Sequence, residues 1–485
     1  MYYFKNLLSI KDALIKSLSD FIGGSPKNRF KKMFEIFDGR EDLEFCEVIS
    51  MKSKSQFVAI GLMLFAMFFG AGNLIFPPSL GQAAGENIVP AILGFLVTGC
   101  GLPLLAVVAV CYSGKDFQDI ASRVSPGYGI FLVCAISLTI GPFFAIPRTC
   151  STAFEMALAP TLGEDAGFMP LFLFSIVFFI VSLWLAIKPS KLVNSIGHVL
   201  TPAILILLAV LFIVYLIAPF GSWQAPSEAH QNGASAFLVG ILEGYNTMDG
   251  LAGLIFGILV VNAVRDLGID DQKTIAKATF LSGVIACGCM AVIYVLLSFI
   301  GASSVEALGH LPNGALILVG TMNYYFGGIG AMLLGILVLL ACLTTSIGLI
   351  ASIAALFNKM FPVLSFRAYA ISFTVFSMGV ANFGLTTIIS AAIPVLVFVY
   401  PLAIALIILT FLNDNFDGDP IVHRVATAFT FVPAISDGMG VLGVSPTWWH
   451  GVMSAMPLAD YGLTWIPFFS TGLIIGWVIH LMKKN

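Results

Sequence analysis

The feature that most constrains this chain is the recurrence of apolar runs of about 20 residues, separated by short polar stretches. Apolar residues make up 59% of its 485 residues and charged residues only 10%, too little charge to cover a water-soluble protein of this length. In a bilayer every backbone N–H and C=O must find a partner within the protein, and helices satisfy this requirement. The sequence therefore predicts an all-α integral membrane protein that crosses the bilayer many times.

We predict twelve membrane spans from these runs. They cover residues 57–81, 88–112, 128–153, 169–187, 195–218, 234–262, 279–301, 328–356, 367–386, 389–412, 421–443 and 461–482. Of the thirteen Lys and Arg residues beyond residue 56, twelve fall in alternate loops or at the C-terminus, and Arg148 is the exception. The positive-inside rule then places both termini in the cytoplasm.

Residues 1–50 have a different composition, with eight Lys/Arg and eight Asp/Glu. Apolar residues at helical spacing near their start predict a short amphipathic helix at a cytoplasmic interface. The alternative is a mis-assigned start, because Met51, followed by KSKSQ and the first apolar run, resembles an ordinary beginning for a membrane protein. We expect this extension to be dispensable.

The first span is interrupted by FFGAGNLIFPP, residues 68–78. About thirteen residues of helix precede the interruption, roughly 20 Å, so it falls past the midplane. Gly70 and Gly72 permit backbone conformations closed to other residues, while Pro77 and Pro78 should limit the helix that follows. An unwound segment survives in a membrane only inside protein or beside a polar cavity, so the stretch is either a simple kink or part of a binding site.

The sixth span carries a second interruption, at Gly244, Asn246 and Asp249. Because the first span enters from the cytoplasm and the sixth from outside, the two breaks can meet near the midplane. Paired interrupted helices point to the substrate site of a secondary transporter, where half-helix N-termini bind a carboxylate and exposed carbonyls bind a small cation. We predict two halves of inverted topology and a final pair of spans, at residues 56–218, 234–412 and 421–482.

The eighth span contains two adjacent hydroxyls in LLACLTTSIGLIAS. Ala341 lies three and four residues before Thr344 and Thr345, on one helical face. These hydroxyls either bond back to their own helix or serve as oxygen ligands for a monovalent cation. The residues alone leave both interpretations open.

The stretches FFGAGNLIFPPSLGQAAGENIVPAILGF, GPFFAIPRT and GYNTMD closely resemble the branched-chain amino acid:cation symporter family, the BrnQ-type carriers. The resemblance runs from about residue 56 to the C-terminus. It implies a LeuT-like fold of five-plus-five inverted repeats with helices 1 and 6 broken. It also implies Na⁺-coupled import of leucine, isoleucine and valine across a bacterial cytoplasmic membrane, with Na⁺ as coupling ion and no cofactor. The alternative is a proton-coupled or exchange-type carrier of other neutral amino acids.

The same resemblance implies the site residues, although for the sixth span it identifies the segment and not the individual contacts. The backbone of the first break should receive the substrate carboxylate. The implied substrate-binding set is Gly70, Ala71, Gly72, Asn73, Gly244, Tyr245, Asn246 and Asp249. The implied Na⁺-binding set is Ala66, Phe68, Phe69, Asn73, Ala341, Thr344 and Thr345.

Ionisable residues inside the spans complete the list of candidates. Arg148 should lie near the outer end of its span, where it either snorkels to the surface or forms an outer gate with Glu155 or Asp437. Asp249 falls deeper, and an intramembrane ionisable residue is a functional candidate by default. It is expected to be a cation partner, an anchor for the substrate ammonium, or a structural acid bonded to the unwound backbone. Glu243 is a weaker candidate.

Other functional classes find little support. An enzyme would need a nucleophile, a metal cluster or paired acids, but the chain has no H-E-x-x-H, no G-x-S-x-G and only six scattered histidines. A channel would need a continuous polar pathway, whereas polarity here is concentrated at the breaks. We therefore expect no enzymatic activity, no nucleic-acid partner and no obligatory protein partner, with the lipid bilayer as the surroundings.

Overall fold

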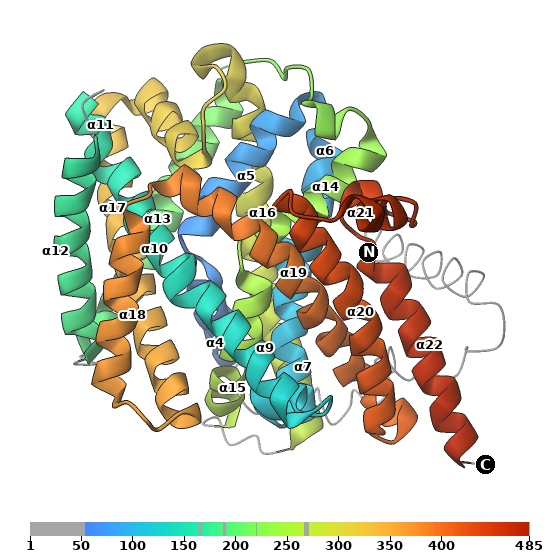
Figure 1. Cartoon of the computed structure of the whole chain (residues 1–485). Helices are drawn as coiled ribbons and strands as arrows, with labels where there is room; N and C mark the ends of the chain where they lie inside the picture. Colours follow the sequence, from blue (N-terminus) through green and yellow to red (C-terminus); the bar gives the residue numbers. More distant parts are fainter. Residues whose placement is uncertain (1–53, 164–166, 188–190, 220, 266–270, 485) are drawn as a thin grey trace. The chain divides into compact units, whose positions relative to one another are not determined.

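The apolar runs fold as α-helices (Figure 1). The computed structural model describes residues 54–163, 167–187, 191–219, 221–265 and 271–484 of the chain. The predicted extension at residues 1–50 lies outside these ranges. Residues 59–485 form one structural unit. In chain order the helices are α4 (Lys54–Phe68), α5 (Ala71–Ala84), α6 (Ile88–Leu96), α7 (Leu102–Ser113), α8 (Phe117–Ala121), α9 (Pro126–Leu138), α10 (Ala145–Ala153), α11 (Ala159–Leu162), α12 (Phe168–Ile187), α13 (Lys191–Ile217), α14 (Gly233–Tyr245), α15 (Asp249–Arg265), α16 (Gln272–Leu308), α17 (Gly314–Met360), α18 (Phe366–Ala381), α19 (Leu385–Leu412), α20 (Pro420–Val441), α21 (Thr447–Ser454) and α22 (Trp465–Lys484).

Helices occupy each of the predicted membrane spans. Within the described ranges, 7 helical stretches are long and apolar enough to cross a membrane, and shorter apolar helices of 10–17 residues accompany them. The first span is divided between α4 and α5, and the sixth between α14 and α15. The predicted class, an all-helical membrane protein with these two helices broken, is confirmed.

The third span differs from its prediction as one continuous helix. After α9 the chain passes through a π-helical turn at Thr139–Phe143, and α10 begins at Ala145. Gly141 has non-helical backbone angles (φ −101°, ψ −122°). Pro142 has no N–H to continue the hydrogen-bond ladder, which explains why the helix bends here.

The stretch 302–327, predicted as a loop, is mostly helical. α16 extends to Leu308, and α17 begins at Gly314 and changes direction at Gly327, which has φ 63°. Only glycine adopts such an angle readily, so Gly327 joins a short helical arm to the membrane-spanning part of α17.

The broken helices each pack against a helix of the other predicted half. α5 packs along α16, while α6 and α7 pack along α14 and α15. The α6–α14 contact is close, since a Cβ on Gly94 or Gly240 would overlap the backbone of the opposite helix. The first span thus contacts the seventh and the sixth contacts the second, the reciprocal arrangement that a two-fold relation between inverted halves produces. The boundaries 56–218 and 234–412 remain predictions.

Loops that carry Lys and Arg gather at one end of this unit. Lys359 Nζ lies 3.3 Å from Asp116 Oδ2, which joins the loop after α7 to the end of α17. We call this the basic end, marked by Lys115, Arg123, Lys359, Arg424 and Lys484. Loops without basic residues meet at the opposite end, where the amide and hydroxyl of Ser222 donate to Glu306 at 2.7 and 2.8 Å.

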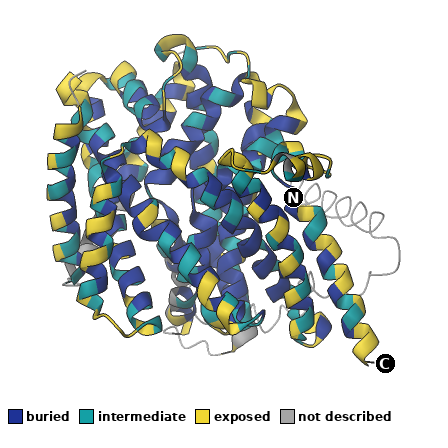
Figure 2. Ribbon diagram, viewed as in Figure 1, coloured by how far each residue is buried: buried dark blue, intermediate teal, exposed yellow. Residues whose placement is uncertain are grey.

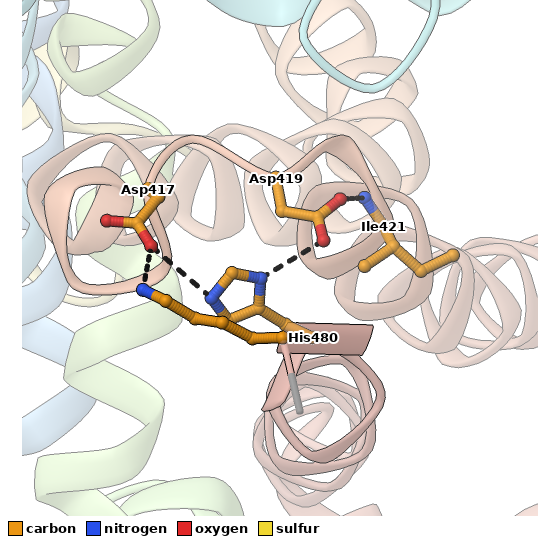
Figure 3. Close-up of polar contacts among 5 residues, drawn as sticks. Asp417, Asp419, Ile421 and His480 are labelled. Carbon is orange, nitrogen blue, oxygen red and sulfur yellow. Dashed lines mark hydrogen bonds and ion pairs between the residues drawn. The ribbon is translucent and has the colours of Figure 1, made fainter. Parts of the chain in front are cut away.

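At the basic end, the last turn of α22 is tied to the loop before α20 (Figure 3). Lys484 Nζ donates to Asp417 Oδ2 at 2.6 Å, and His480 Nδ1 lies 3.1 Å from Asp419 Oδ2. Asp419 also accepts the N–H of Ile421 at 3.0 Å and so caps α20. The Lys484 ammonium lowers the pKa of Asp417, and the Ile421 amide, followed by His480, lowers the pKa of Asp419.

Apolar side chains cover the outward faces of the helices at the edges of the unit. On α12, Leu173 is 57% exposed and Val177 63% exposed. Figure 2 shows such exposed faces on α12 and α22 around a buried interior. Apolar surface of this extent is unfavourable in water and favourable against lipid, as expected for an integral membrane protein.

Candidate substrate site

The first span unwinds between α4 and α5. α4 ends at Phe68 and α5 begins at Ala71, with Gly70 in an extended conformation and its N–H donating to Asn73 Oδ1 at 2.9 Å. The first N–H groups of a helix have no partner within it, and Gly70 has no side chain to cap them. Because Ala71, Gly72 and Asn73 are buried, these amides and the positive end of α5 lie inside the protein.

The prolines of this motif do not limit α5 as predicted. Pro77 and Pro78 lie inside the helix, which begins six residues before Pro77 and continues to Ala84. Each proline removes one backbone N–H, so one turn of α5 has fewer backbone hydrogen bonds, but the helix continues through it. The glycines alone mark where the helix is broken.

The sixth span unwinds between α14 and α15. α14 ends at Tyr245, α15 begins at Asp249, and Met248 between them has φ 66°. A non-glycine residue held in this left-handed region costs about 1–3 kcal/mol, a strain that clusters at functional sites. Thr247 Oγ1 donates to the carbonyl of Gly244 at 3.0 Å and accepts the N–H of Asp249 at 3.4 Å, which fixes the shape of the break.

The sequence predicted that the two breaks meet, and in the structure Asn73 at the first break bonds to Asp249 at the second. Asn73 Nδ2 donates to Asp249 Oδ2 at 2.6 Å and also to the hydroxyl of Tyr294 on α16. The Tyr294 hydroxyl in turn donates to Asp249 Oδ2 at 3.3 Å. All three side chains are at most 5% exposed, so their polar groups depend on one another for hydrogen bonds. We call this set, Asn73, Asp249 and Tyr294, the junction.

Arg148 lies beside the junction and does not reach the surface. It is 5% exposed, and Nη1 donates to the carbonyl of Asn246 at 2.7 Å, with Nη2 3.4 Å from that of Thr247. Its guanidinium lies 5.1 Å from the ring centre of Phe76, and a Cβ on Gly72 would be 2.8 Å from Nη2. The predictions of a position near the outer end and of snorkelling are wrong, because the third span bends before α10 and a residue count along a straight helix does not apply.

The proposed gate partners of Arg148 bond to other residues in this structure. Glu155 accepts a hydrogen bond from Asn313 Nδ2 at 2.8 Å, and Asp437 accepts one from Thr464 Oγ1 at 2.7 Å. Among the described residues, no carboxylate forms a direct ion pair with Arg148. A gate of Arg148 with either acid is therefore not formed here.

The remaining residues predicted from the sixth span have separate positions. Gly244 packs against the end of α6 and the π-helical turn that follows it (Val97–Gly101), because a Cβ there would overlap the carbonyl of Phe95 and the side chain of Thr98. Tyr245 stacks on Tyr400 of α19 with ring centres 4.1 Å apart. Asn246 Nδ2 donates to the Glu243 carboxylate oxygen Oε2 at 2.9 Å, while the carbonyl of Asn246 accepts a hydrogen bond from Arg148.

The hydroxyls of α17 bond back to their own helix. Thr344 and Thr345 each donate from Oγ1 to the carbonyl of Ala341 at 2.9 Å. A hydroxyl that donates its proton retains lone pairs for a cation. A Cβ on Gly70 would lie 3.7 Å from Thr345 Oγ1, which places Thr345 against the first break.

The end of α4 presents backbone oxygens at the first break. The last four carbonyls of a helix, here those before the break, have no partner within it. The rings at this end pack on apolar neighbours, with Phe69 stacked 5.0 Å from Phe65 and Phe68 6.3 Å from Phe256. Only the carbonyls of Ala66, Phe68 and Phe69 therefore remain as predicted cation ligands.

Sequence reasoning missed two aromatic residues at this place, Tyr294 and Tyr400. Tyr294 is fully buried and packs edge-to-face on Phe95, with ring centres 5.3 Å apart. Its hydroxyl lies at the junction. A tyrosine in the middle of an apolar span needs a polar partner for its hydroxyl. The position of Tyr294 in the seventh span could therefore have indicated a buried polar site. Tyr400 gave a similar signal in the tenth span.

Two interrupted helices that pack reciprocally, with buried polar groups where their breaks meet, define a multi-pass membrane transporter of the LeuT fold. The solved structure of Mhp1, a nucleobase-cation-symport-1 family transporter in a closed conformation with bromovinylhydantoin bound, has this fold. It matches 87% of this chain and 90% of its own with a TM-score of 0.55 at 15% sequence identity.

The chain belongs to the branched-chain amino acid transport protein family, whose sequence pattern matches residues 53–483. It is 43% identical over 435 residues to the branched-chain amino acid permease BrnQ of Bacillus subtilis, covering 89% of this chain and 98% of that one. It is 41% identical over 425 residues to BraB of the same species, covering 87% and 95%. The protein is thus a transporter and not an enzyme.

Proposed function

We propose that the protein imports leucine, isoleucine and valine together with Na⁺ by alternating access. The family and the relatives named as branched-chain amino acid permeases support the substrate class. The positive-inside rule supports a basic end in the cytoplasm, with both termini on that side of a bacterial cytoplasmic membrane.

The observation that carries this proposal is the junction of the two breaks. A free amino acid has an ammonium and a carboxylate on one carbon, and it needs a buried partner for each. Asp249 supplies a carboxylate for the ammonium, and the N–H groups of Ala71 to Asn73 supply donors for the carboxylate. The rings of Phe76, Tyr245 and Tyr400 nearby offer apolar contacts for a branched side chain.

Na⁺ coupling would come from oxygen ligands on two different helices. The carbonyls at the end of α4 and the oxygens of Ala341, Thr344 and Thr345 are hard, uncharged ligands of the kind a weakly held monovalent cation accepts. An ion held between them ties α4 to α17. By linkage, Na⁺ then raises the affinity for the amino acid by the same factor as the amino acid raises the affinity for Na⁺.

Uptake of radiolabelled leucine into proteoliposomes tests the coupling. We expect an inward Na⁺ gradient at constant pH to drive accumulation. Thr345→Ala should raise the Na⁺ concentration for half-maximal uptake roughly tenfold or more, the effect of leaving a buried ligand set incomplete. Substrate affinity should recover largely at high Na⁺, and Thr345→Ser, which keeps the oxygen, is the matched control with a mild effect.

Two results would contradict this proposal. If a proton gradient without Na⁺ drives leucine uptake as well as a Na⁺ gradient does, the coupling ion is the proton. If Thr344→Ala and Thr345→Ala both leave the Na⁺ dependence unchanged, the hydroxyls only bond back to Ala341 and the ion lies elsewhere.

A further inference from the structure

The guanidinium of Arg148 is a fixed positive charge at the place where the substrate would bind. It is held by the carbonyls of Asn246 and Thr247 at the carboxyl end of α14, and it lies against the ring of Phe76. Partial negative charge collects at that end of a helix, so these carbonyls orient the side chain. They offset its charge only in part, because helix-end dipoles are weaker than a carboxylate.

The guanidinium also lies against the first turn of α5. A Cβ on Gly72 would lie 2.8 Å from Arg148 Nη2, so nothing larger than glycine fits between that backbone and the guanidinium. The N-terminus of α5 is the positive end of its helix. A buried cation against a positive helix end is an unfavourable arrangement that an anion bound to both would relieve.

Among the described residues, no acid forms a direct ion pair with Arg148 that would supply that anion. Asp249 Oδ2 is bonded to Asn73 and Tyr294, and no direct ion pair joins Asp249 to Arg148 in the part of the chain described. Glu155 and Asp437 have other partners. A buried charge is costly unless it is paired. A guanidinium kept here without a direct partner therefore indicates that a ligand supplies the negative charge.

We propose that Arg148 binds the α-carboxylate of the transported amino acid, together with the first-turn amides of α5. The ammonium then lies toward Asp249, so that one buried acid and one buried base recognise the zwitterion. This assignment rests on the proposed function, and it gives Arg148 a substrate-binding role in place of a gate. A planar guanidinium suits it because it can donate two parallel hydrogen bonds to a carboxylate.

Equilibrium binding of L-leucine and L-leucinamide to the purified protein separates this role from others. Leucinamide keeps the ammonium and the side chain but has no carboxylate. We expect the wild type to prefer leucine strongly. Arg148→Gln should weaken leucine binding at least about 30-fold while leaving leucinamide binding nearly unchanged, because only leucine loses a charged partner. Arg424→Gln, which removes another arginine that donates to a backbone carbonyl, should change neither.

Three outcomes would overturn the assignment. A gate residue would slow uptake while leaving the binding of both ligands unchanged. A purely structural residue would weaken both ligands equally. If Arg148→Gln does not fold, Gly72→Ala gives the same comparison, since a Cβ at Gly72 would displace the guanidinium. Unchanged discrimination in that folded variant also refutes the assignment.

This result is separable from the proposed function. If the wild type fails to bind leucine at all, the proposed function fails before Arg148 is considered. If the wild type binds and transports leucine with Na⁺, but the preference for leucine over leucinamide survives in Arg148→Gln, only the role of Arg148 is wrong.

Discussion

The broken helices α4, α5, α14 and α15 differ from the continuous pair α20 and α22 in where their polar groups lie. α20 and α22 pack tightly, with Gly472 and Gly476 of α22 against α20, and the core beside them is apolar. The ionic groups that join the start of α20 to the end of α22, Asp417, Asp419 and Lys484, stand at the basic end (Figure 3). One further acid, Asp437, lies near the other end of α20, where it is half-buried and accepts a hydrogen bond from Thr464. The broken helices also pack closely through glycines, but their polar groups are buried at the junction.

This difference separates structural polar groups from functional ones. Ion pairs exposed to water contribute little to stability, since water and salt screen them. Buried polar groups are expensive, and their partners must be nearly complete. The protein therefore places its dispensable charges at the end of a continuous helix pair and its costly ones where two helices are interrupted. We expect mutations in the two regions to differ accordingly.

The largest effect should follow from filling the space at the first break. Gly72→Val places a branched side chain where even a Cβ would be 2.8 Å from Arg148 Nη2. Leucine binding should weaken by at least about 100-fold, since a displacement of about 1 Å at a binding group can cost that much. Radioligand binding to purified protein measures it. Gly379→Val on α18, where a Cβ would meet nothing within 4 Å, is the control that should bind normally.

Wild-type affinity in Gly72→Val would contradict the carboxylate site at α5. It would also remove the contrast between the two regions, because a change at the break would then be as harmless as one on a lipid-facing helix.

A much smaller and different effect should follow from Asp419→Ala at the basic end. The variant loses the cap of α20, which costs about 1 kcal/mol of stability, and leucine binding should not change. Because the pKa of Asp419 is lowered in the folded protein, its stabilising contribution is present above the ordinary aspartate pKa of about 4 and is lost as the pH falls below it.

Thermal unfolding in detergent checks this pH dependence. The difference in midpoint between wild type and Asp419→Ala should be present at pH 7 and should narrow below about pH 4. A difference that grows on acidification, or a loss of leucine binding at pH 7, would show that this cluster is coupled to the transport site.

The two breaks could be predicted because their signal is local. Gly70 and Gly72, and likewise Gly244 and Asn246, interrupt apolar helices with residues that disfavour helix in lipid. The structure breaks within two residues of these positions, after Phe68 and after Tyr245. Asp249 was also predictable, because an acid inside an apolar span stands out against its surroundings.

The partners of these residues could not be predicted because they depend on packing between distant segments. Tyr294 is 221 positions from Asn73, and Arg148 lies about a hundred positions before the carbonyls it contacts. The depth of Arg148 also depends on the bend at Gly141, which a count of residues along a straight span ignores. Local composition showed where the chain is interrupted, and the packing of the helices determined what meets there.

The most direct test of the central claim, that the junction of the breaks is the amino-acid site, is leucine binding by Asp249→Asn. The substitution keeps the shape and a hydrogen-bonding oxygen but removes the charge that would face the ammonium. Asp437→Asn is the matched control, since Asp437 is a half-buried acid that also accepts a hydroxyl hydrogen bond. We predict at least about 30-fold weaker leucine binding for Asp249→Asn and near wild-type binding for Asp437→Asn. Wild-type leucine affinity in folded Asp249→Asn would contradict the claim.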